Sequence, residues 1–372
     1  MNITIVTGLT NETEALEVLE DIPHLSYSAR IIIAITMILT LVFGTIGNSI
    51  VLALFVKYKS LRTSSNIFIC SLTVADLLMC LGGLPTLIST YVSQEIRTEL
   101  LQLFCHYDTF IGAFTGFGAI WSLMVLAIDR CVVISRSMPV QRPSDKIAAY
   151  YITAIIWIVS FAIALMPFIG FGHYVIEGSK IECSVKQFTR SLQNISYNIL
   201  IQLLYFCLPI VTMIFCYGTI FIKVRNHERR YFDARSRANV DDTSFRRMRK
   251  NRKLERNEMK TAKAGLILIS VFCLSWTPYS IVSWIGLFGD RSTITPLIVA
   301  LPAVFAKVST IMNPLLYALL LRSFKLKLSL FYQQHFKSAR ASNVSSVRTH
   351  MDYLSQLDRQ KFIEQIGKQE NV

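Results

Sequence analysis

The amino-acid sequence predicts an all-α fold, a seven-transmembrane helix bundle with a short amphipathic eighth helix. The chain has 372 residues, of which 52% are hydrophobic and 17% are charged, and its mean hydropathy is +0.45. That composition is too apolar for a soluble domain of this length. Seven stretches are long and apolar enough to cross a bilayer. They lie at residues 29–57, 64–92, 102–136, 147–171, 195–225, 256–288 and 293–321.

The uneven distribution of charge predicts the orientation in the membrane. The first 29 residues carry five acidic residues and no Lys or Arg, whereas Lys223 to Lys260 carries fourteen Lys and Arg against six Asp and Glu. Because basic links stay in the cytoplasm, we expect a multi-pass plasma-membrane protein with an extracellular N-terminus. Nucleic-acid binding is another common reason for a basic stretch. We reject it because the basic residues are concentrated in every second link between spans, which are the links on one side of the membrane.

These spans divide the chain into four parts. We expect an extracellular tail over residues 1–28, the bundle over 29–321, the amphipathic helix 8 over 322–335 and a cytoplasmic tail over 336–372. Asn2 and Asn11 each begin an Asn-X-Thr glycosylation acceptor in the predicted outer tail. Cys105 and Cys183 both fall on the outer, oxidising side, where a disulfide between them would hold the loop after the fourth span over the bundle.

Lys307 is the only charged residue in the apolar run from about Thr295 to Leu321. In a helix that starts near Pro296 it lies about 16 Å from the helix start, at about 1.5 Å of rise per residue. A lysine at that depth is costly, and an ionisable group inside a membrane is a functional-site candidate. The alternative, a side chain that reaches the interface, needs a longer stem than lysine has.

Each span also carries one polar or helix-breaking landmark, and the landmarks occur in a specific order. In chain order they are Gly47-Asn48, Leu72-Thr73-Val74-Ala75-Asp76, Asp129-Arg130-Cys131, Trp157, Pro209 with Tyr217, Ser275-Trp276-Thr277-Pro278, and Asn313-Pro314-Leu315-Leu316-Tyr317. Over residues 30–335 the chain resembles the rhodopsin-like, or class A, G-protein-coupled receptors. Cys131 departs from the Tyr usual in that family. Around Lys307, Leu301 to Ser309 resembles an opsin, of a type other than the vertebrate visual ones.

The resemblance implies that Lys307 binds retinal, 11-cis or all-trans, covalently through a protonated Schiff base. A lysine amine attacks an aldehyde only when it is neutral, and burial favours the neutral form. The matching pocket residues of the family are small or aromatic. They are Gly116, Tyr205, Phe206, Trp276, Tyr279 and Ala303. Aromatic side chains at these positions are also compatible with ordinary bundle core.

A buried cation needs a carboxylate partner, and the resemblance offers two. Asp108, one helical turn after Cys105, matches the helix 3 counterion of vertebrate visual opsins, and Glu177 matches a loop counterion of many other opsins. We favour Asp108 and keep Glu177 as the alternative. Neither position excludes an ordinary solvated acid.

The other end of the bundle carries the residues that the resemblance assigns to activation. Asp129 and Arg130 with Glu258 form a predicted ionic contact between the third and sixth spans. Further predicted switch residues come from the later spans, namely Tyr217, Asn313, Pro314 and Tyr317. The implied partners are a heterotrimeric G protein, a receptor kinase and arrestin.

The favoured function is therefore a light-sensing receptor, not an enzyme, with no metal site. One alternative is a class A receptor for a diffusible ligand, in which Lys307 pairs an anionic ligand or an acid. Another is a retinal photoisomerase with little signalling, which the intact Asp129-Arg130 pair argues against. A transporter is rejected because paired repeats and broken half-helices are missing from the sequence.

Overall fold

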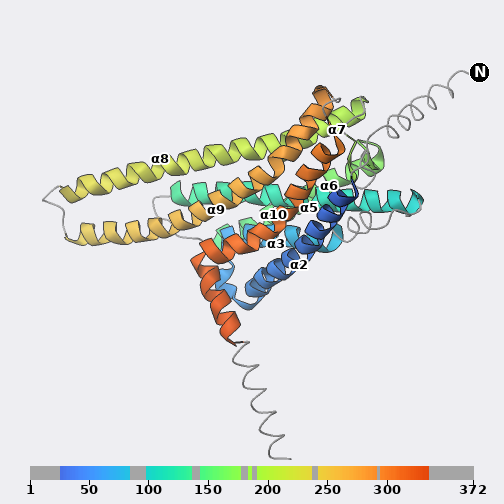
Figure 1. The fold of residues 1–372 in the computed structure, drawn as a ribbon. Helices are drawn as coiled ribbons and strands as arrows, with labels where there is room; N and C mark the ends of the chain where they lie inside the picture. The colour runs from blue at the N-terminus through green and yellow to red at the C-terminus, as the bar shows by residue number, and fades with distance from the viewer. Residues whose placement is uncertain are drawn as a thin grey trace, which may run out of the picture. The chain divides into compact units, whose positions relative to one another are not determined.

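The computed structural model describes residues 26–83, 98–135, 143–176, 183–186, 191–236, 242–290 and 294–334. The chain divides into two units, Met1–Leu321 and Arg322–Val372. The first unit contains the helix bundle, whose long helices run side by side (Figure 1). Within the described residues, seven helical segments are long and apolar enough to cross a membrane, as predicted. In the second unit, a helix covers residues 322–334, close to the predicted helix 8.

The seven spans are built from the following elements. Their bounds are α2 (Tyr27–Lys57), α3 (Ser64–Leu78) with the π-turn η2 (Met79–Gly83), α5 (Thr98–Ser135), α6 (Pro143–Leu165) with the 3-10 turn η3 (Met166–Ile169), α7 (Leu192–Gln202) continued by the π-turn η4 (Leu203–Cys207) and α8 (Leu208–Ser236), α9 (Asp242–Phe288), and α10 (Pro296–Leu320). A 3-10 turn η1 (Lys59–Leu61) joins α2 to α3. The last part of the second predicted span, from residue 84, lies outside the described residues.

Helix α5 is the central element of the bundle. It packs against α3, α6, α8 and α9, while α10 packs against α9, α2 and α3. The helices are apolar on nearly all sides, and the outward-facing residues stay apolar too, for example Ile158 and Phe215. Such all-round apolarity is typical of helices that face lipid on one side and neighbours on the other.

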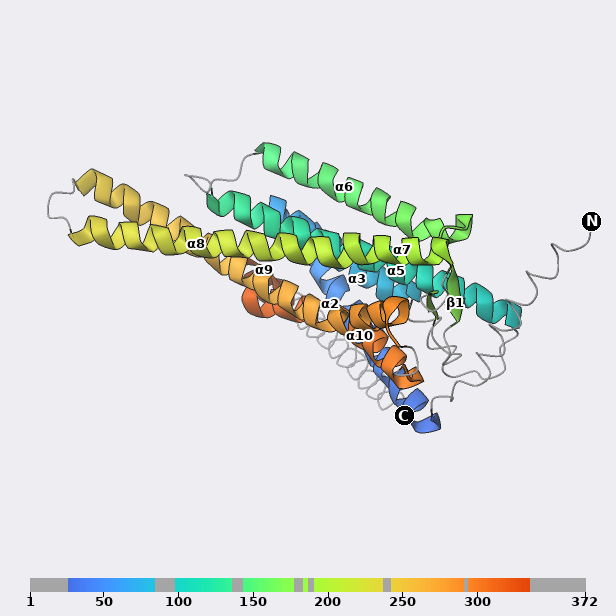
Figure 2. The ribbon, with the colours of Figure 1, turned by 90° about the horizontal axis from the view of Figure 1, so that it is seen from above.

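Two helices are longer than the hydropathy predicts. Helix α8 continues to Ser236, eleven residues beyond the predicted end at 225, and α9 begins at Asp242 instead of 256. The added turns are rich in Arg, Lys and Glu, which favour helix without being apolar. The two helices run alongside each other beyond the rest of the bundle in both views (Figures 1 and 2).

A short hairpin was not predicted. Strands β1 (Tyr174–Ile176) and β2 (Cys183–Val185) pair antiparallel, with Tyr174 opposite Val185 and Ile176 opposite Cys183. Both strands pack against α5. The Tyr174 hydroxyl donates a hydrogen bond to the Ala164 carbonyl oxygen at 2.7 Å, which ties the hairpin to the end of α6.

Candidate functional site

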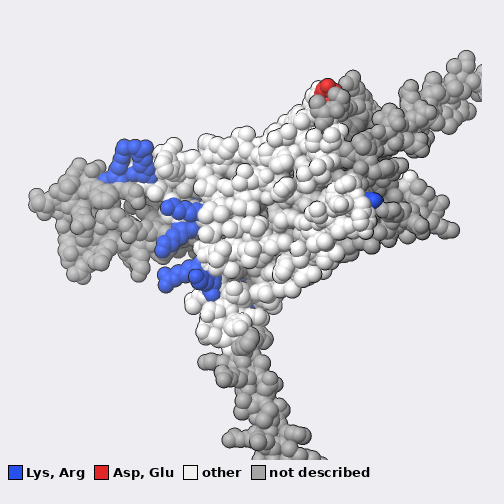
Figure 3. Space-filling model, in the orientation of Figure 1, with Lys and Arg blue, Asp and Glu red and all other residues white. Residues whose placement is uncertain are grey.

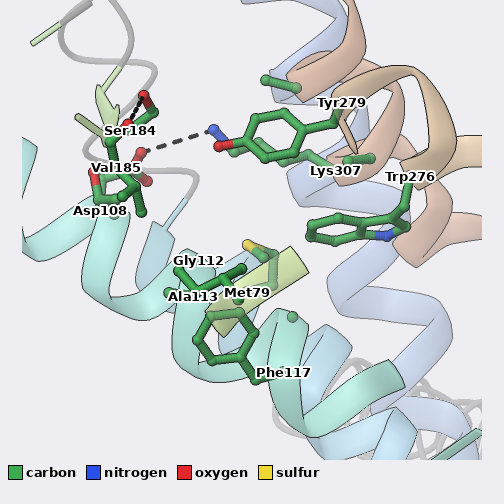
Figure 4. Close-up of a pocket in the computed structure, with 15 residues that line it drawn as sticks. Met79, Asp108, Gly112, Ala113, Phe117, Ser184, Val185, Trp276, Tyr279 and Lys307 are labelled. Carbon is green, nitrogen blue, oxygen red and sulfur yellow. Dashed lines mark hydrogen bonds and ion pairs between the residues drawn. The ribbon is translucent and has the colours of Figure 1, made fainter. Parts of the chain in front are cut away.

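A cavity of about 120 Å³ lies in the bundle, between α5, α7, α9 and α10, with β2 on one side. Lys307 of α10 lines it, as do Trp276 and Tyr279 of α9 (Figure 4). The lysine side chain is 12% exposed. The side chain predicted to carry the chemistry therefore does reach a buried cavity.

Asp108 faces the lysine across this cavity (Figure 4). Its Oδ2 lies 3.7 Å from the Lys307 Nζ, and the residue is 5% exposed. The other carboxylate oxygen, Oδ1, is buried and has no hydrogen-bond partner among the described residues. A carboxylate that is so poorly solvated is costly without a cation beside it. The arrangement therefore places a negative charge where a cation on Lys307 would need one.

Four of the six predicted pocket residues line the cavity: Gly116, Trp276, Tyr279 and Ala303. At Gly116 an added Cβ would lie 2.9 Å from the Trp276 Cη2, so the absence of a side chain lets the indole approach α5. The Trp276 ring meets the Tyr279 ring edge-on, with centroids 6.4 Å apart. Gly116 thus makes room for the Trp276 indole, so that α9 and α5 are in contact at this point of the cavity wall.

Tyr205 and Phe206 lie in η4 and do not line the described cavity. The Tyr205 ring stacks on the Phe117 ring of α5 with centroids 3.7 Å apart. Its hydroxyl is buried without a hydrogen-bond partner among the described residues. Phe117 itself does line the cavity. The stacked pair therefore closes the cavity on this side.

Several lining residues were missed by the sequence analysis. Gly112 and Thr109 lie on the same face of α5 as Gly116 and Asp108. Gly112 is four residues from both, and Thr109 is three residues before Gly112, so helical spacing would have indicated them. Ser184 and Val185 come from β2. Their only signal in the sequence is that they follow Cys183.

Cys105 is held in a disulfide. The cysteines at 70, 80, 131, 207, 216 and 273 are free thiols. The backbone of Cys183 belongs to β2, but its side chain lies outside the described residues, so the Cys105–Cys183 pairing stays a prediction. Glu177, Asn2 and Asn11 also lie outside them, and of Glu258 only the backbone, in α9, is described.

We expect Cys105→Ala to lower the free energy of unfolding by about 2–5 kcal/mol, the usual loss when a native disulfide is removed. Thermal melting of the purified protein measures this loss. Cys70→Ala is the matched control, because Cys70 is a free thiol. Equal melting of the two variants would contradict the prediction.

Arg130 is buried at the opposite end of α5, with 2% of it exposed. Its Nη2 lies 2.6 Å from the Asp129 Oδ2 and also contacts the Ser65 hydroxyl. The Ser64 hydroxyl donates to the Asp129 Oδ1 at 2.8 Å, and the Ser65 hydroxyl donates to Oδ2. The first turn of α3 thus holds the predicted Asp129-Arg130 pair, a role for Ser64 and Ser65 that the sequence analysis missed.

The remaining switch residues come from α8 and α10. The Asn313 Nδ2 donates to the Asp76 Oδ2 at 2.8 Å, and Asn48 bonds the Thr310 carbonyl oxygen at 3.1 Å. Pro314 packs so closely on α2 that a Cβ at Gly47 would lie 2.8 Å from its Cγ. Tyr317 is fully buried. The Tyr217 hydroxyl is buried without a hydrogen-bond partner among the described residues.

No group of three or more potential metal ligands occurs in the part of the chain that the structure describes.

Comparison with known proteins identifies the family. The family model for the 7 transmembrane receptor (rhodopsin family) matches residues 47–317. The Gq-coupled rhodopsin of Mizuhopecten yessoensis is 30% identical over 80% of this chain and 58% of the relative. The lateral eye opsin of Limulus polyphemus is 30% identical over 77% of this chain and 75% of the relative. A crystal structure of squid rhodopsin matches with a TM-score of 0.75 at 30% identity, covering 84% of this chain and 88% of that one.

The first four curated relatives are longer than this chain, which spans 46–62% of their lengths. The matched region still contains all seven spans in part or in full, together with Lys307 and Asp108. The chain therefore belongs to the rhodopsin family of seven-transmembrane receptors and, within it, to the opsins of the invertebrate type.

Proposed function

We propose that this protein is a light-sensing G-protein-coupled receptor that carries retinal on Lys307 as a protonated Schiff base. One observation supports this most strongly: Lys307 reaches a buried cavity and faces the Asp108 carboxylate at 3.7 Å. Retinal would supply a conjugated aldehyde that attaches to the amine and changes shape when it absorbs light. The chain's own residues would hold it, pair its charge and transmit the change.

The residues around Lys307 fit such a group in chemistry and in placement. The amine and the carboxylate face each other, and the aromatic rings of Trp276, Tyr279 and Phe117 also line the cavity. Small-molecule pockets typically hold about 300–1,000 Å³, which exceeds the 120 Å³ of this cavity. We therefore infer that the cavity widens when the chromophore binds.

Asp108 is our proposed counterion. Its Oδ2 faces the lysine and its Oδ1 remains an open acceptor among the described residues, so a water or the linkage itself has an oxygen to bind. Trp276 would be the residue that senses the chromophore's change of shape, because its ring lines the cavity and lies against Gly116 of α5.

The end of the bundle that contains Arg130 favours a signalling receptor over a protein that only photoisomerises retinal. Arg130 is buried and is held by Asp129 and Ser65, while Ser64 donates to Asp129. Breaking these contacts would release a charged side chain on activation. Described Lys and Arg residues gather at one end of the bundle (Figure 3). Exposed members from four different helices include Lys57, Lys146, Lys223 and Lys260. We infer from the positive-inside rule that this end is cytoplasmic and meets the G protein, then a receptor kinase and arrestin.

The test uses purified protein in lipid nanodiscs with 11-cis-retinal, kept in the dark and then illuminated. We expect a visible absorption band and, on illumination, nucleotide exchange on a Gq heterotrimer, which the name of one relative makes the first choice. A visible band without light-dependent exchange on any G-protein class would favour a photoisomerase. No band would favour a receptor for a diffusible ligand.

The serine contacts give a further prediction. We expect the double change Ser64→Ala and Ser65→Ala to raise nucleotide exchange in the dark several-fold, because hydrogen bonds to charged groups contribute roughly 1.5–3 kcal/mol each. Exchange by the purified variant in the dark measures it. Ser275→Ala is the control, since that hydroxyl bonds only the Val271 carbonyl of its own helix. Dark exchange equal to that of the control would show that the serines do not restrain Arg130.

A further inference from the structure

Tyr217 lies on α8, where its hydroxyl is in an unusual position. The oxygen is buried and has no hydrogen-bond partner among the described residues. Folded proteins satisfy most buried polar atoms, so an exception calls for an explanation. Arg130 is close enough to interact electrostatically with this phenol, and it donates hydrogen bonds to Asp129 and Ser65. A charged donor is thus nearby but not bonded to the hydroxyl.

The hydroxyl lies instead against Gly265 of α9. A Cβ added at Gly265 would be 2.7 Å from the Tyr217 Oη, and the next described atom is the Leu126 Cδ2 at 4.0 Å. Real Cβ atoms do not approach an oxygen that closely. The tyrosine therefore occupies the space that any side chain at residue 265 would need.

Close helix packing, the ordinary reason for a glycine inside a membrane helix, does not explain Gly265. No described backbone atom outside α9 lies within 4 Å of the added Cβ. A glycine in a helix interior is also less favourable than alanine. Only the tip of the Tyr217 side chain uses the space.

We propose that Gly265 is a positioning residue that keeps Tyr217 away from Arg130 in the resting receptor. The inference rests on the proposed function, because its consequence is a change in G-protein activation. A side chain at residue 265 expels the hydroxyl, and the described charged donor that already interacts with it electrostatically is Arg130. The tyrosine thus moves between two positions, one provided by a glycine and one by an arginine.

The first experiment measures nucleotide exchange in the dark with purified receptor in nanodiscs. We expect Gly265→Ala to raise it roughly tenfold, equivalent to about 1.4 kcal/mol of preference for the active form. Gly218→Ala is the matched control, because it makes the same Gly-to-Ala change in α8 and its Cβ meets no described atom within 4 Å. In the Tyr217→Phe background, which removes the oxygen, Gly265→Ala should leave dark exchange unchanged. Unchanged exchange in the single variant, or an increase that persists without the oxygen, would overturn the proposal.

The second experiment is a thermal-melting cycle of the unsubstituted protein, Gly265→Ala, Tyr217→Phe and the double variant, which needs no G protein. The added methyl conflicts only with the hydroxyl, so Gly265→Ala should lower the melting temperature more in the tyrosine background than in the Tyr217→Phe background. A single variant that fails to fold but is rescued by Tyr217→Phe supports the same contact. Equal shifts in both backgrounds contradict it.

The two measurements separate this inference from the proposed function. If the unsubstituted protein shows no light-dependent exchange, the proposed function has failed, and the melting cycle alone decides whether Gly265 positions Tyr217. If melting is coupled while dark exchange stays unchanged, the contact exists without the positioning role, and the proposal is overturned.

Discussion

Lys307→Ala should abolish the visible absorption band completely, because the side chain removed is the only lysine that lines the described cavity. Lys307→Arg should abolish it as well, since a guanidinium stays protonated and cannot form the linkage. The measurement is an absorption spectrum after incubation with 11-cis-retinal in the dark.

The two substitutions differ in their effect on the fold, which makes them useful together. Lys307→Ala leaves Asp108 buried without the lysine that pairs with it, and breaking a buried pair costs about 3–5 kcal/mol. Lys307→Arg keeps a positive charge, so it separates the loss of chemistry from the loss of stability. Lys57→Ala, at an exposed lysine, is the control that should keep the band. A visible band in either Lys307 variant, with a retinyl group that stays covalently attached after borohydride reduction, would rule out Lys307 as the attachment site.

Asp108→Asn should move the dark absorption from the visible to the near ultraviolet at neutral pH. At 3.7 Å and an effective dielectric constant of about 20, a carboxylate stabilises a neighbouring cation by a few kcal/mol. Each 1.4 kcal/mol is a factor of ten, so the protonated linkage should lose its proton at neutral pH once this charge is removed. The carboxylate favours the protonated form, and its loss therefore makes deprotonation occur at lower pH. Acidification or added halide should restore the visible band.

The controls for Asp108→Asn distinguish the two candidate counterions. Asp76→Asn removes a different buried acid, one that accepts a hydrogen bond from Asn313, and should leave the band visible. Glu177→Gln should change the dark band little. If Glu177→Gln gives the ultraviolet pigment and Asp108→Asn does not, Glu177 is the counterion. If neither changes the band, the charge comes from a bound anion or another group.

The membrane spans were predictable because hydropathy is a local property of the sequence. The predicted starts at 29 and 64 agree with α2 and α3 to within two residues. The lengths of α8 and α9 were not predictable in this way, since their added turns are polar helix formers outside the apolar spans. The hairpin of β1 and β2 was missed because strands of three residues depend on packing against α5 and not on a local pattern.

In the candidate site, too, features local to one segment could be predicted from the sequence, and contacts between segments could not. Lys307 could be found from the sequence because a lone charge in a long apolar helix stands out. Its pairing with Asp108 followed from a family resemblance, and the structure supplies the distance of 3.7 Å. The contact of Ser65 with Asp129 joins residues 64 positions apart, and that of Gly265 with Tyr217 joins α9 to α8. Neither leaves a pattern within one segment, so both required three-dimensional packing.

The most direct test of the central claim is to locate the retinal on the chain. The purified protein would be incubated with 11-cis-retinal in the dark, reduced with borohydride, digested and analysed by mass spectrometry. The account predicts a single reduced retinyl group on the peptide that contains Lys307. A retinyl group on another lysine, or none on any peptide of a protein that is folded by thermal melting, would contradict it.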